Sequence, residues 1–167
     1  MTNPANKTVL ITGAGGGFGR HMVQQFRAAG SKLIVTDISD AALAPAVEDA
    51  GEDLVGSTTA DLATEQGCNE LGEFCTALGV IPDVVVNNAG IVFPAAPVQD
   101  TTEGQFDELI RVNVKGTYLG CRLAFPYLRE TRGCVLNISS LVGIVGERSH
   151  AVYSATKGAI NALTKST

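Results

Sequence analysis

Short apolar runs alternate with longer amphipathic segments along most of the chain. The short runs are rich in β-branched residues and are bounded by turn residues, which is typical of strands buried on both faces of a sheet. They cover residues 7–12, 32–36, 54–59, 84–86 and 134–138. The longer segments predict helices: one after residue 17, one over residues 39–50, one after residue 61, one from 102 to about 128, and one from about 151 to the end.

Residues with capping chemistry support several of these helix ends. Thr102 and Gln105 have the spacing of a capping box, and Gly30 stands where a glycine commonly ends a helix. Asp61 is in a position to cap the third helix. A single long helix is expected after Thr102.

The regular alternation of strands and helices predicts an α/β fold. Helical crossovers between successive strands enforce parallel pairing and a right-handed connection. The expected architecture is a doubly wound parallel sheet, the Rossmann fold, with strands in the order 3-2-1-4-5 and the later strands of that fold absent. We therefore expect residues 1–167 to form a single dinucleotide-binding domain that stops early.

Composition and charge narrow the class of partner. The chain is 45% hydrophobic and only 17% charged, so it has enough apolar side chains for a packed core. Its net charge of −5 argues against broad binding to nucleic acid or to an anionic membrane. Residues 1–7 lack a secretory pattern, and no apolar run of about 18 residues is present for a membrane span. A cytoplasmic protein is expected.

The cysteines give no sign of a metal site or a disulfide framework. They form no C-x-x-C pair and show no ligand spacing with either histidine. Reduced thiols, most of them in the core, are expected at Cys68, Cys75, Cys121 and Cys134.

A glycine cluster follows the first predicted strand and precedes the first helix. Glycines at such a turn let the backbone approach a pyrophosphate, whose charge is received by the free N–H groups of the helix. The strand–turn–helix context therefore predicts a dinucleotide site. The residues expected to form it are Thr12, Gly13, Gly15, Gly17, Phe18 and Gly19.

Asp37 ends the second predicted strand, roughly 20 residues after the glycine loop. A carboxylate there can accept hydrogen bonds from the ribose diol of adenosine and would repel a 2′-phosphate. Neither Ile38 nor the loop positions Gly15 and Gly16 supply a basic side chain. NAD is therefore favoured over NADP.

Further polar residues mark a possible reaction centre. Asn113 lies on the predicted inward face of the long helix, where its amide is satisfied by local backbone or holds a water or a lysine. Ser140 follows the fifth strand, at the end of a parallel sheet where ligands bind. Tyr153 and Lys157 are one helical turn apart, and an adjacent ammonium would lower the pKa of the tyrosine. A tyrosine tuned in this way is a plausible acid/base group.

Taken together, these motifs resemble the short-chain dehydrogenase/reductase family. The resemblance rests on Thr12-Gly13-x-x-x-Gly17-x-Gly19, Asn87-Asn88-Ala89-Gly90, Asn113, Ser140 and Tyr153-x-x-x-Lys157, and it runs through essentially the whole chain. It implies an oxidoreductase that transfers a hydride between a nicotinamide cofactor and a secondary alcohol or ketone.

The resemblance also implies a role for each residue. Tyr153 would be the catalytic acid/base, and Lys157 would lower its pKa and bind the nicotinamide ribose. Ser140 would hydrogen-bond the substrate oxygen, and Asn113 would hold the water of a proton relay. The remaining cofactor contacts would come from Asp61 and Leu62 at the adenine and from Asn88, Ala89 and Gly90 beside the dinucleotide.

The family pattern continues beyond residue 167 with a strand, a substrate-covering loop and further helices, which this sequence lacks. Two alternatives therefore stay open: a catalytically poor nucleotide-binding remnant, and an NADPH-dependent reductase of 3-oxoacyl type. The family resemblance implies a homo-oligomer if the chain is complete. An isolated fragment with an open sheet edge would be prone to aggregation.

Overall fold

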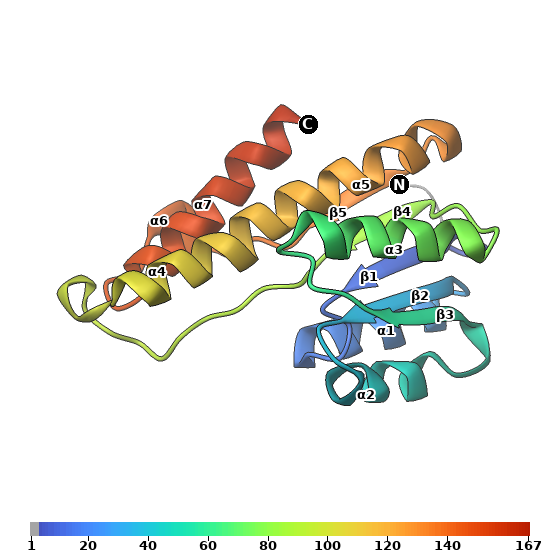
Figure 1. Cartoon of the computed structure of the whole chain (residues 1–167), viewed down its shortest axis with the longest axis horizontal. Coiled ribbons are helices and arrows are strands. Elements are labelled where there is room, and N and C mark those ends of the chain that lie inside the picture. The colour runs from blue at the N-terminus through green and yellow to red at the C-terminus, as the bar shows by residue number, and fades with distance from the viewer. Residues whose placement is uncertain (1–3) are drawn as a thin grey trace.

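A computed structural model describes residues 4–167, so the first three positions of the amino-terminal segment lie outside the described part. The described chain forms one parallel sheet in the order β3-β2-β1-β4-β5 (Figure 1). The predicted fold class and strand order are confirmed. The strands are β1 (Thr8–Thr12), β2 (Lys32–Asp37), β3 (Leu54–Thr59), β4 (Val84–Asn87) and β5 (Cys134–Asn137).

Helices cover both faces of the sheet, and successive residues of β1 point into different cores. Val9 and Ile11 pack in the core on the side of α1 and α2, whereas Leu10 packs in the core on the side of α3 and α5. This alternation explains why the strands read as continuous apolar runs. The helices are α1 (Gly17–Ala28), α2 (Asp40–Ala50), α3 (Glu65–Ala77), α4 (Glu103–Leu109), α5 (Gly116–Thr131), α6 (Val142–Val145) and α7 (Ala151–Ser166).

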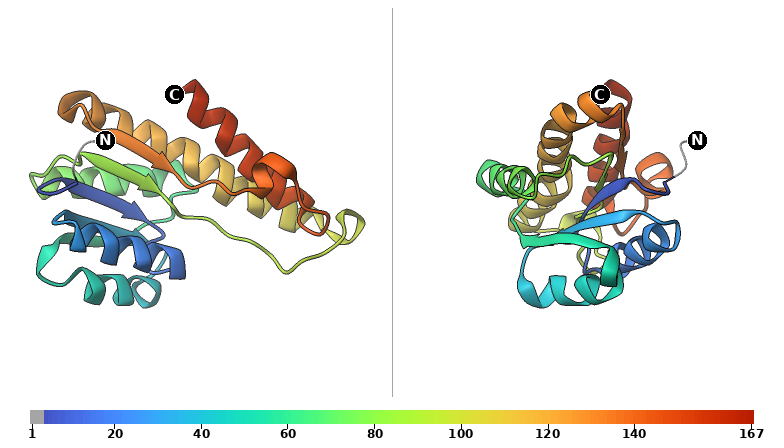
Figure 2. Two further views of the ribbon diagram at one scale, coloured as in Figure 1. Left: turned by 180° about the vertical axis from the view of Figure 1, so that it is seen from behind. Right: turned by 90° about the vertical axis from the view of Figure 1, so that its right-hand side faces the viewer.

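The second half of the chain extends beyond the carboxyl ends of the strands. Helices α4, α6 and α7 lie together there, and the long segment that follows β4 runs out to α4 (Figures 1 and 2). Helix α7 packs against α6, α4 and the segment before α5. Residues from α7 are thereby brought close to the sheet edge that carries the glycine loop.

The helix ends follow the predictions with one exception. Thr102 and Gln105 form the expected capping box, and Gly30 follows α1 with a φ of +82°. The prediction that Asp61 caps the third helix is wrong, because the hydroxyl of Thr64 accepts the cap hydrogen bond from the Gly67 N–H. Asp61 instead accepts from the Ala63 N–H and pairs with Arg111. Asp61 and Thr64 both carry oxygens that can cap a helix, and their spacing in the sequence does not show which of them does so.

The single long helix predicted after Thr102 is divided into three pieces. Between α4 and α5 the backbone forms a π-helix over Ile110–Lys115, which contains the buried Asn113. Such wide turns are rare and often occur at functional sites. The helical spacing of Phe106, two turns before Asn113, places it on the same predicted inward face, but its side chain is 47% exposed, so the prediction is wrong there. The short α6 lies between the fifth predicted strand and the last predicted helix, where the sequence predicted no helix.

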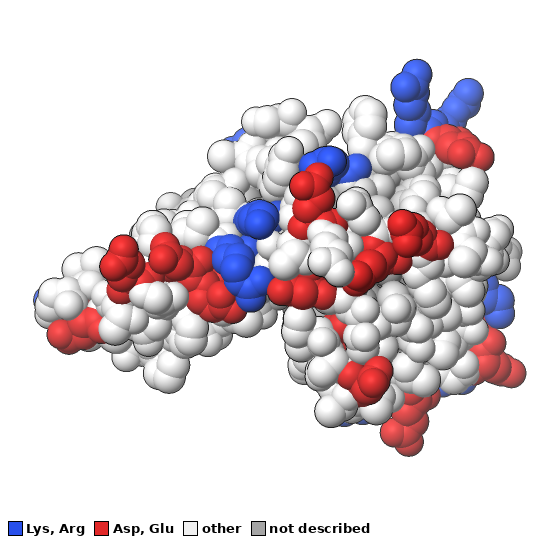
Figure 3. All heavy atoms as spheres, in the orientation of Figure 1, with Lys and Arg blue, Asp and Glu red and all other residues white. Residues whose placement is uncertain are grey.

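Strand β5 is an edge strand in the described sheet, since it pairs with β4 alone. Its Leu136 side chain is about half exposed. Residues 4–167 contain no helix that is long and apolar enough to cross a membrane. The four cysteines are free, and all but Cys134 are buried, as predicted for core thiols. On the face seen in Figure 3, acidic side chains are scattered widely and the basic ones form small groups.

Candidate active site

A cavity of about 500 Å³ opens at the carboxyl ends of the central strands. Two predicted cofactor residues, Asp37 and Asp61, line it from the ends of β2 and β3. Predicted residues that line it elsewhere are Gly13, Gly15, Gly17, Phe18, Gly19, Leu62, Asn88, Ala89 and Gly90. Thus the fold brings nearly all predicted cofactor residues to one cavity. This is the sheet edge at which open α/β folds bind their ligands.

Three predicted cofactor residues, Thr12, Tyr153 and Lys157, do not line this cavity. Thr12 lies beneath the glycine loop. Its buried hydroxyl donates to the Val86 carbonyl and accepts from the backbone N–H groups of Asn88 and Ala89. Asn88 in turn donates from its side chain to the carbonyls of Thr12 and Gly13, each at 2.9 Å. These two side chains brace the glycine loop against the turn after β4.

Close backbone packing requires glycine at three loop positions. Gly13 has a φ of +59°, and a Cβ there would lie 2.7 Å from the Ala89 Cα. A Cβ on Gly15 or Gly19 would collide with the backbone carbonyl oxygen of Ala42 or Gly13. The amino terminus of α1 therefore sits directly against the cavity. Its N-cap, Gly16, makes no side-chain cap hydrogen bond, which leaves first-turn N–H groups available for an anion.

Asp37 is held beside this loop in a fixed orientation. One carboxylate oxygen accepts from the Gly15 N–H at 2.9 Å, and the other accepts from the Ile38 N–H at 2.7 Å. A carboxylate can accept about four hydrogen bonds, two on each oxygen, so each oxygen of Asp37 retains one free acceptor position. The side chain can therefore receive further donors from a ligand in the cavity.

Tyr153 and Lys157 lie together on α7, as their spacing predicted. The Lys157 Nζ is 5.6 Å from the centroid of the Tyr153 ring and donates to the Ile138 carbonyl at 2.8 Å. A Cβ on Gly90 would lie 3.8 Å from that Nζ. Because Gly90 also lines the cavity, the Tyr–Lys pair adjoins it.

Asn113 connects the segment after β4 to α7. Its amide oxygen accepts from the Ile91 N–H, and its amide nitrogen donates to the Ile91 carbonyl and to the Thr156 hydroxyl. Of the two readings the sequence left open, these contacts match an amide satisfied by its surroundings. The amide thereby holds the residue next to Lys157, and its oxygen lies 3.2 Å from the Cβ position of Gly90.

The two serines after β5 are held differently. The Ser139 hydroxyl donates to the Lys157 carbonyl at 2.9 Å, which ties the end of β5 to α7. The Ser140 hydroxyl accepts from the Val142 N–H at 3.4 Å at the start of α6. Ser140 therefore stays at the end of the sheet, where the sequence placed it, with its O–H free to donate.

The acid–base properties of the pair differ from the prediction. Burial raises the pKa of Tyr153 above its usual value, whereas the sequence predicted that Lys157 would lower it. The Lys157 side chain is itself almost fully buried, and this burial lowers its pKa. Its Nζ points at a carbonyl and lies over the ring rather than at the phenol oxygen, so desolvation outweighs attraction.

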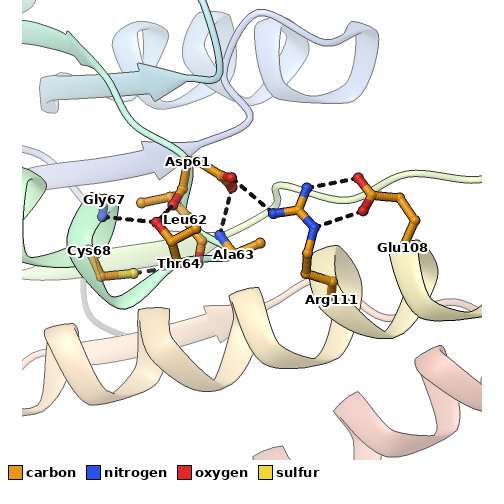
Figure 4. A network of polar contacts seen from close by, with 8 residues as sticks. All are labelled: Asp61, Leu62, Ala63, Thr64, Gly67, Cys68, Glu108 and Arg111. Atoms are coloured by element: carbon orange, nitrogen blue, oxygen red, sulfur yellow. Dashed lines mark hydrogen bonds and ion pairs between the residues drawn. The ribbon is translucent and has the colours of Figure 1, made fainter.

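The cavity also contains a network of ion pairs that was not predicted from the sequence. The Arg111 guanidinium makes two hydrogen bonds to Glu108, each 2.7 Å long, and one of 2.9 Å to Asp61 (Figure 4). The i,i+3 spacing of Glu108 and Arg111 is a visible helix signal. The third partner lies 50 residues away, so only the fold could reveal it.

Comparison with known proteins identifies several relatives. The L-fucose dehydrogenase of Oryctolagus cuniculus is 40% identical over 164 residues, which cover 96% of this chain and 56% of that protein. The 2-(R)-hydroxypropyl-CoM dehydrogenase of Xanthobacter autotrophicus is 34% identical over 168 residues, which cover 96% of this chain and 67% of that protein. These relatives are dehydrogenases by name.

Solved structures match the fold closely. A 3-ketoacyl-(acyl-carrier-protein) reductase from Brucella melitensis, complexed with NADH, superposes with a TM-score of 0.91 at 30% identity. The match covers 98% of this chain and 69% of that one. An NAD⁺-bound xylitol dehydrogenase gives a TM-score of 0.90 at 27% identity, over 99% of this chain and 65% of that one.

The chain is shorter than these proteins. It spans between 56% and 60% of the length of four mammalian L-fucose dehydrogenases. The sequence profile of the short chain dehydrogenases nevertheless matches residues 7–167, which include the glycine loop and the Tyr–Lys pair. The chain therefore belongs to the short-chain dehydrogenase family.

Proposed function

We propose that the chain binds NAD(H) in the cavity and supports hydride transfer between the nicotinamide and a secondary alcohol or ketone. The observation that carries this proposal is the position of Gly90, which lines the cavity and also adjoins the Lys157 Nζ. The dinucleotide site and the acid/base pair are thereby continuous. The NADH and NAD⁺ complexes named among the similar structures support the same cofactor.

The residues of the chain divide the chemistry between them. A bound nicotinamide would supply or accept the hydride. Tyr153 gives a proton from its phenol to the carbonyl oxygen during reduction and takes one from the alcohol during oxidation. Ser140 donates its free O–H to the same substrate oxygen and so holds the substrate in position for hydride transfer. Lys157 contributes positive charge beside the ring, and Asn113 holds α7 in register through Thr156.

The substrate belongs to the class of small secondary alcohols and their ketones. Next to Tyr153, a recess of about 30 Å³ is lined by Phe93, Pro94 and His150, so apolar and polar groups both stand beside the phenol. A first panel of substrates follows from the relatives' names: L-fucose, xylitol and 2-(R)-hydroxypropyl-CoM. Turnover on such a panel, followed by nicotinamide absorbance, separates an enzyme from a nucleotide-binding remnant.

Asp37 is proposed to select NAD over NADP. Replacing it with alanine removes both the acceptor for the ribose diol and the charge that repels a 2′-phosphate. We expect Asp37→Ala to weaken NADH binding about tenfold and to strengthen NADPH binding by a similar factor, as measured by calorimetric titration. Asp40→Ala is the matched control, since Asp40 is exposed and lies outside the cavity lining.

The alternative of an NADPH-dependent 3-oxoacyl-type reductase makes a different prediction for the same titration. In that case the unmodified chain already binds NADPH well, and the Asp37→Ala substitution raises NADPH affinity only slightly. Equal affinity of the unmodified chain for NADH and NADPH would therefore reject the assignment of NAD.

The raised pKa of Tyr153 predicts a strong pH dependence for one direction of the reaction. The usual tyrosine pKa is 10, and burial moves this one upward, so the phenol keeps its proton at neutral and moderately alkaline pH. Carbonyl reduction uses the protonated form and should stay level from pH 6 to about 9. Alcohol oxidation uses the phenolate and should accelerate about tenfold per pH unit over the same range.

Initial rates in both directions across this range check the prediction. A plateau in oxidation beginning near pH 7 or 8 would show that the pKa is lowered, as the ammonium of Lys157 would do if it approached the phenol oxygen. The reduction rate measured in the same buffers controls for general effects of pH on the protein.

We also propose self-association and a cytoplasmic location. An apolar groove of about 710 Å³ lies between α5, β5 and α7, and the exposed Tyr118 and Phe125 line it. Exposed aromatic side chains of this kind are frequent at protein interfaces. The free thiols support a reducing compartment.

A further inference from the structure

Arg111 joins two carboxylates that come from separate parts of the chain. Glu108 lies on α4, and Asp61 lies in the loop between β3 and α3 (Figure 4). Glu108 engages the guanidinium through both of its oxygens, whereas Asp61 uses one oxygen for Arg111 and the other for the Ala63 N–H at 3.0 Å. The orientation of the Asp61 carboxylate is therefore fixed from two sides.

All three side chains of this network line the cavity. Among the described residues that line it, Arg111 is the one cation, and it stands among three carboxylates, those of Asp37, Asp61 and Glu108. A ligand that carries a pyrophosphate would meet a strongly acidic wall without it. Asp61 and Glu108 each accept one hydrogen bond per oxygen, so each oxygen of Asp61 keeps a position that can accept from a ligand.

The surroundings of Asp61 suit the base of a nucleotide. Leu62, Ala63 and Val112 line the same cavity and give it an apolar surface against which a planar ring can pack. A fixed carboxylate beside such a surface selects rings that carry an N–H donor. Adenine has such a donor in its exocyclic amine.

We propose that Arg111 is a positioning residue that fixes the Asp61 carboxylate as the acceptor for the exocyclic amine of adenine. This inference rests on the proposed function, because it requires that a dinucleotide occupies the cavity. It adds a determinant of base specificity that acts through Asp61 and leaves the acid/base chemistry at Tyr153 unaltered. Loss of Arg111 would allow the Asp61 carboxylate to rotate. The preference of the site for a base that carries an exocyclic amine would then fall.

Reduced nicotinamide hypoxanthine dinucleotide is the appropriate probe. It carries a carbonyl oxygen in place of the amine and a proton on the adjacent ring nitrogen N1, so the atom that takes the amine's position would face the carboxylate without a proton between them. We expect the unmodified 167-residue chain to bind NADH about tenfold more tightly than this analogue, because a hydrogen bond to a charged acceptor is lost.

Substitution of Arg111 tests the positioning role. Arg111→Met should reduce the preference for NADH to about twofold. Arg111→Lys keeps the positive charge but loses the planar guanidinium that binds two carboxylates, and it should retain about a threefold preference. The matched control is Arg122→Met. Arg122 pairs with Glu65 at 2.8 Å outside the cavity, so its loss should leave the tenfold preference unchanged.

The possible results separate cleanly. A loss of preference in Arg111→Met, with NADH still bound and cooperative melting retained, supports the positioning role. A preference that stays near tenfold in both Arg111 variants, or that is missing from the unmodified chain, overturns it. If Arg111→Met melts without cooperativity, the lysine variant decides by the same criterion. Failure of the unmodified chain to bind either nucleotide contradicts the proposed function itself, and this inference with it.

Discussion

Replacement of Tyr153 by phenylalanine is expected to reduce turnover at least a thousandfold while leaving NADH affinity within about threefold of the original. The substitution removes only the phenol oxygen, and the ring still packs beside Lys157 and His150. Proton transfer to the substrate oxygen then has no donor at this position. Steady-state rates and a calorimetric titration with NADH measure the two quantities separately.

A matched substitution shows whether the effect comes from the reactive oxygen or from any change to an aromatic residue. Tyr127 on α5 donates to the Gly72 carbonyl of α3, outside the cavity lining, so Tyr127→Phe should retain turnover within about twofold. Normal turnover in Tyr153→Phe would contradict the assignment of the acid/base role.

Gly19→Ala should have the second large effect. A Cβ at this position would collide with the Gly13 carbonyl oxygen and approach the Ala14 backbone, and neither group can rotate away. The loop must shift, at a cost of about 1–3 kcal/mol, and the melting temperature should fall by about 3–10 °C. We expect NADH affinity to fall more than a hundredfold, because the N–H groups that receive the pyrophosphate move with the loop.

Gly17→Ala is the matched control for the stability effect. It lies in the same loop, but nothing stands within 4 Å of its Cβ position. Alanine also favours the first turn of α1, so the melting temperature should stay level or rise slightly. A similar loss of stability in both variants would show that alanine disturbs the loop in general rather than through the contact with Gly13.

Local patterns predicted most of the fold. The apolar runs located five strands, because that signal recurs within a few residues of sequence. Their order followed from the Rossmann fold that the alternation of strands and helices indicates. The π-helical segment around Asn113 was not predictable in this way. Its sequence has ordinary helical periodicity, whereas the π-helical segment contacts α7 and is hydrogen-bonded through Asn113 to Ile91 after β4, both distant in sequence.

In the candidate site, too, local features were predictable from the sequence and features that depend on distant contacts were not. Glycine spacing and the position of Asp37 were visible because one strand–turn–helix unit contains them. The pKa of Tyr153 was predicted in the wrong direction, because the effect of Lys157 depends on where its Nζ points and how deeply it is buried. The Asp61–Arg111 pair spans 50 residues, and no local signal joins its members.

The central claim, that the cavity is an NAD(H) site, is tested most directly by calorimetric titration of the unmodified 167-residue chain with NADH. We predict one binding site per chain with a Kd on the order of 10–100 µM and at least tenfold weaker binding of NADPH. The absence of any binding heat or competition up to millimolar NADH, in a chain that melts cooperatively, would contradict the account.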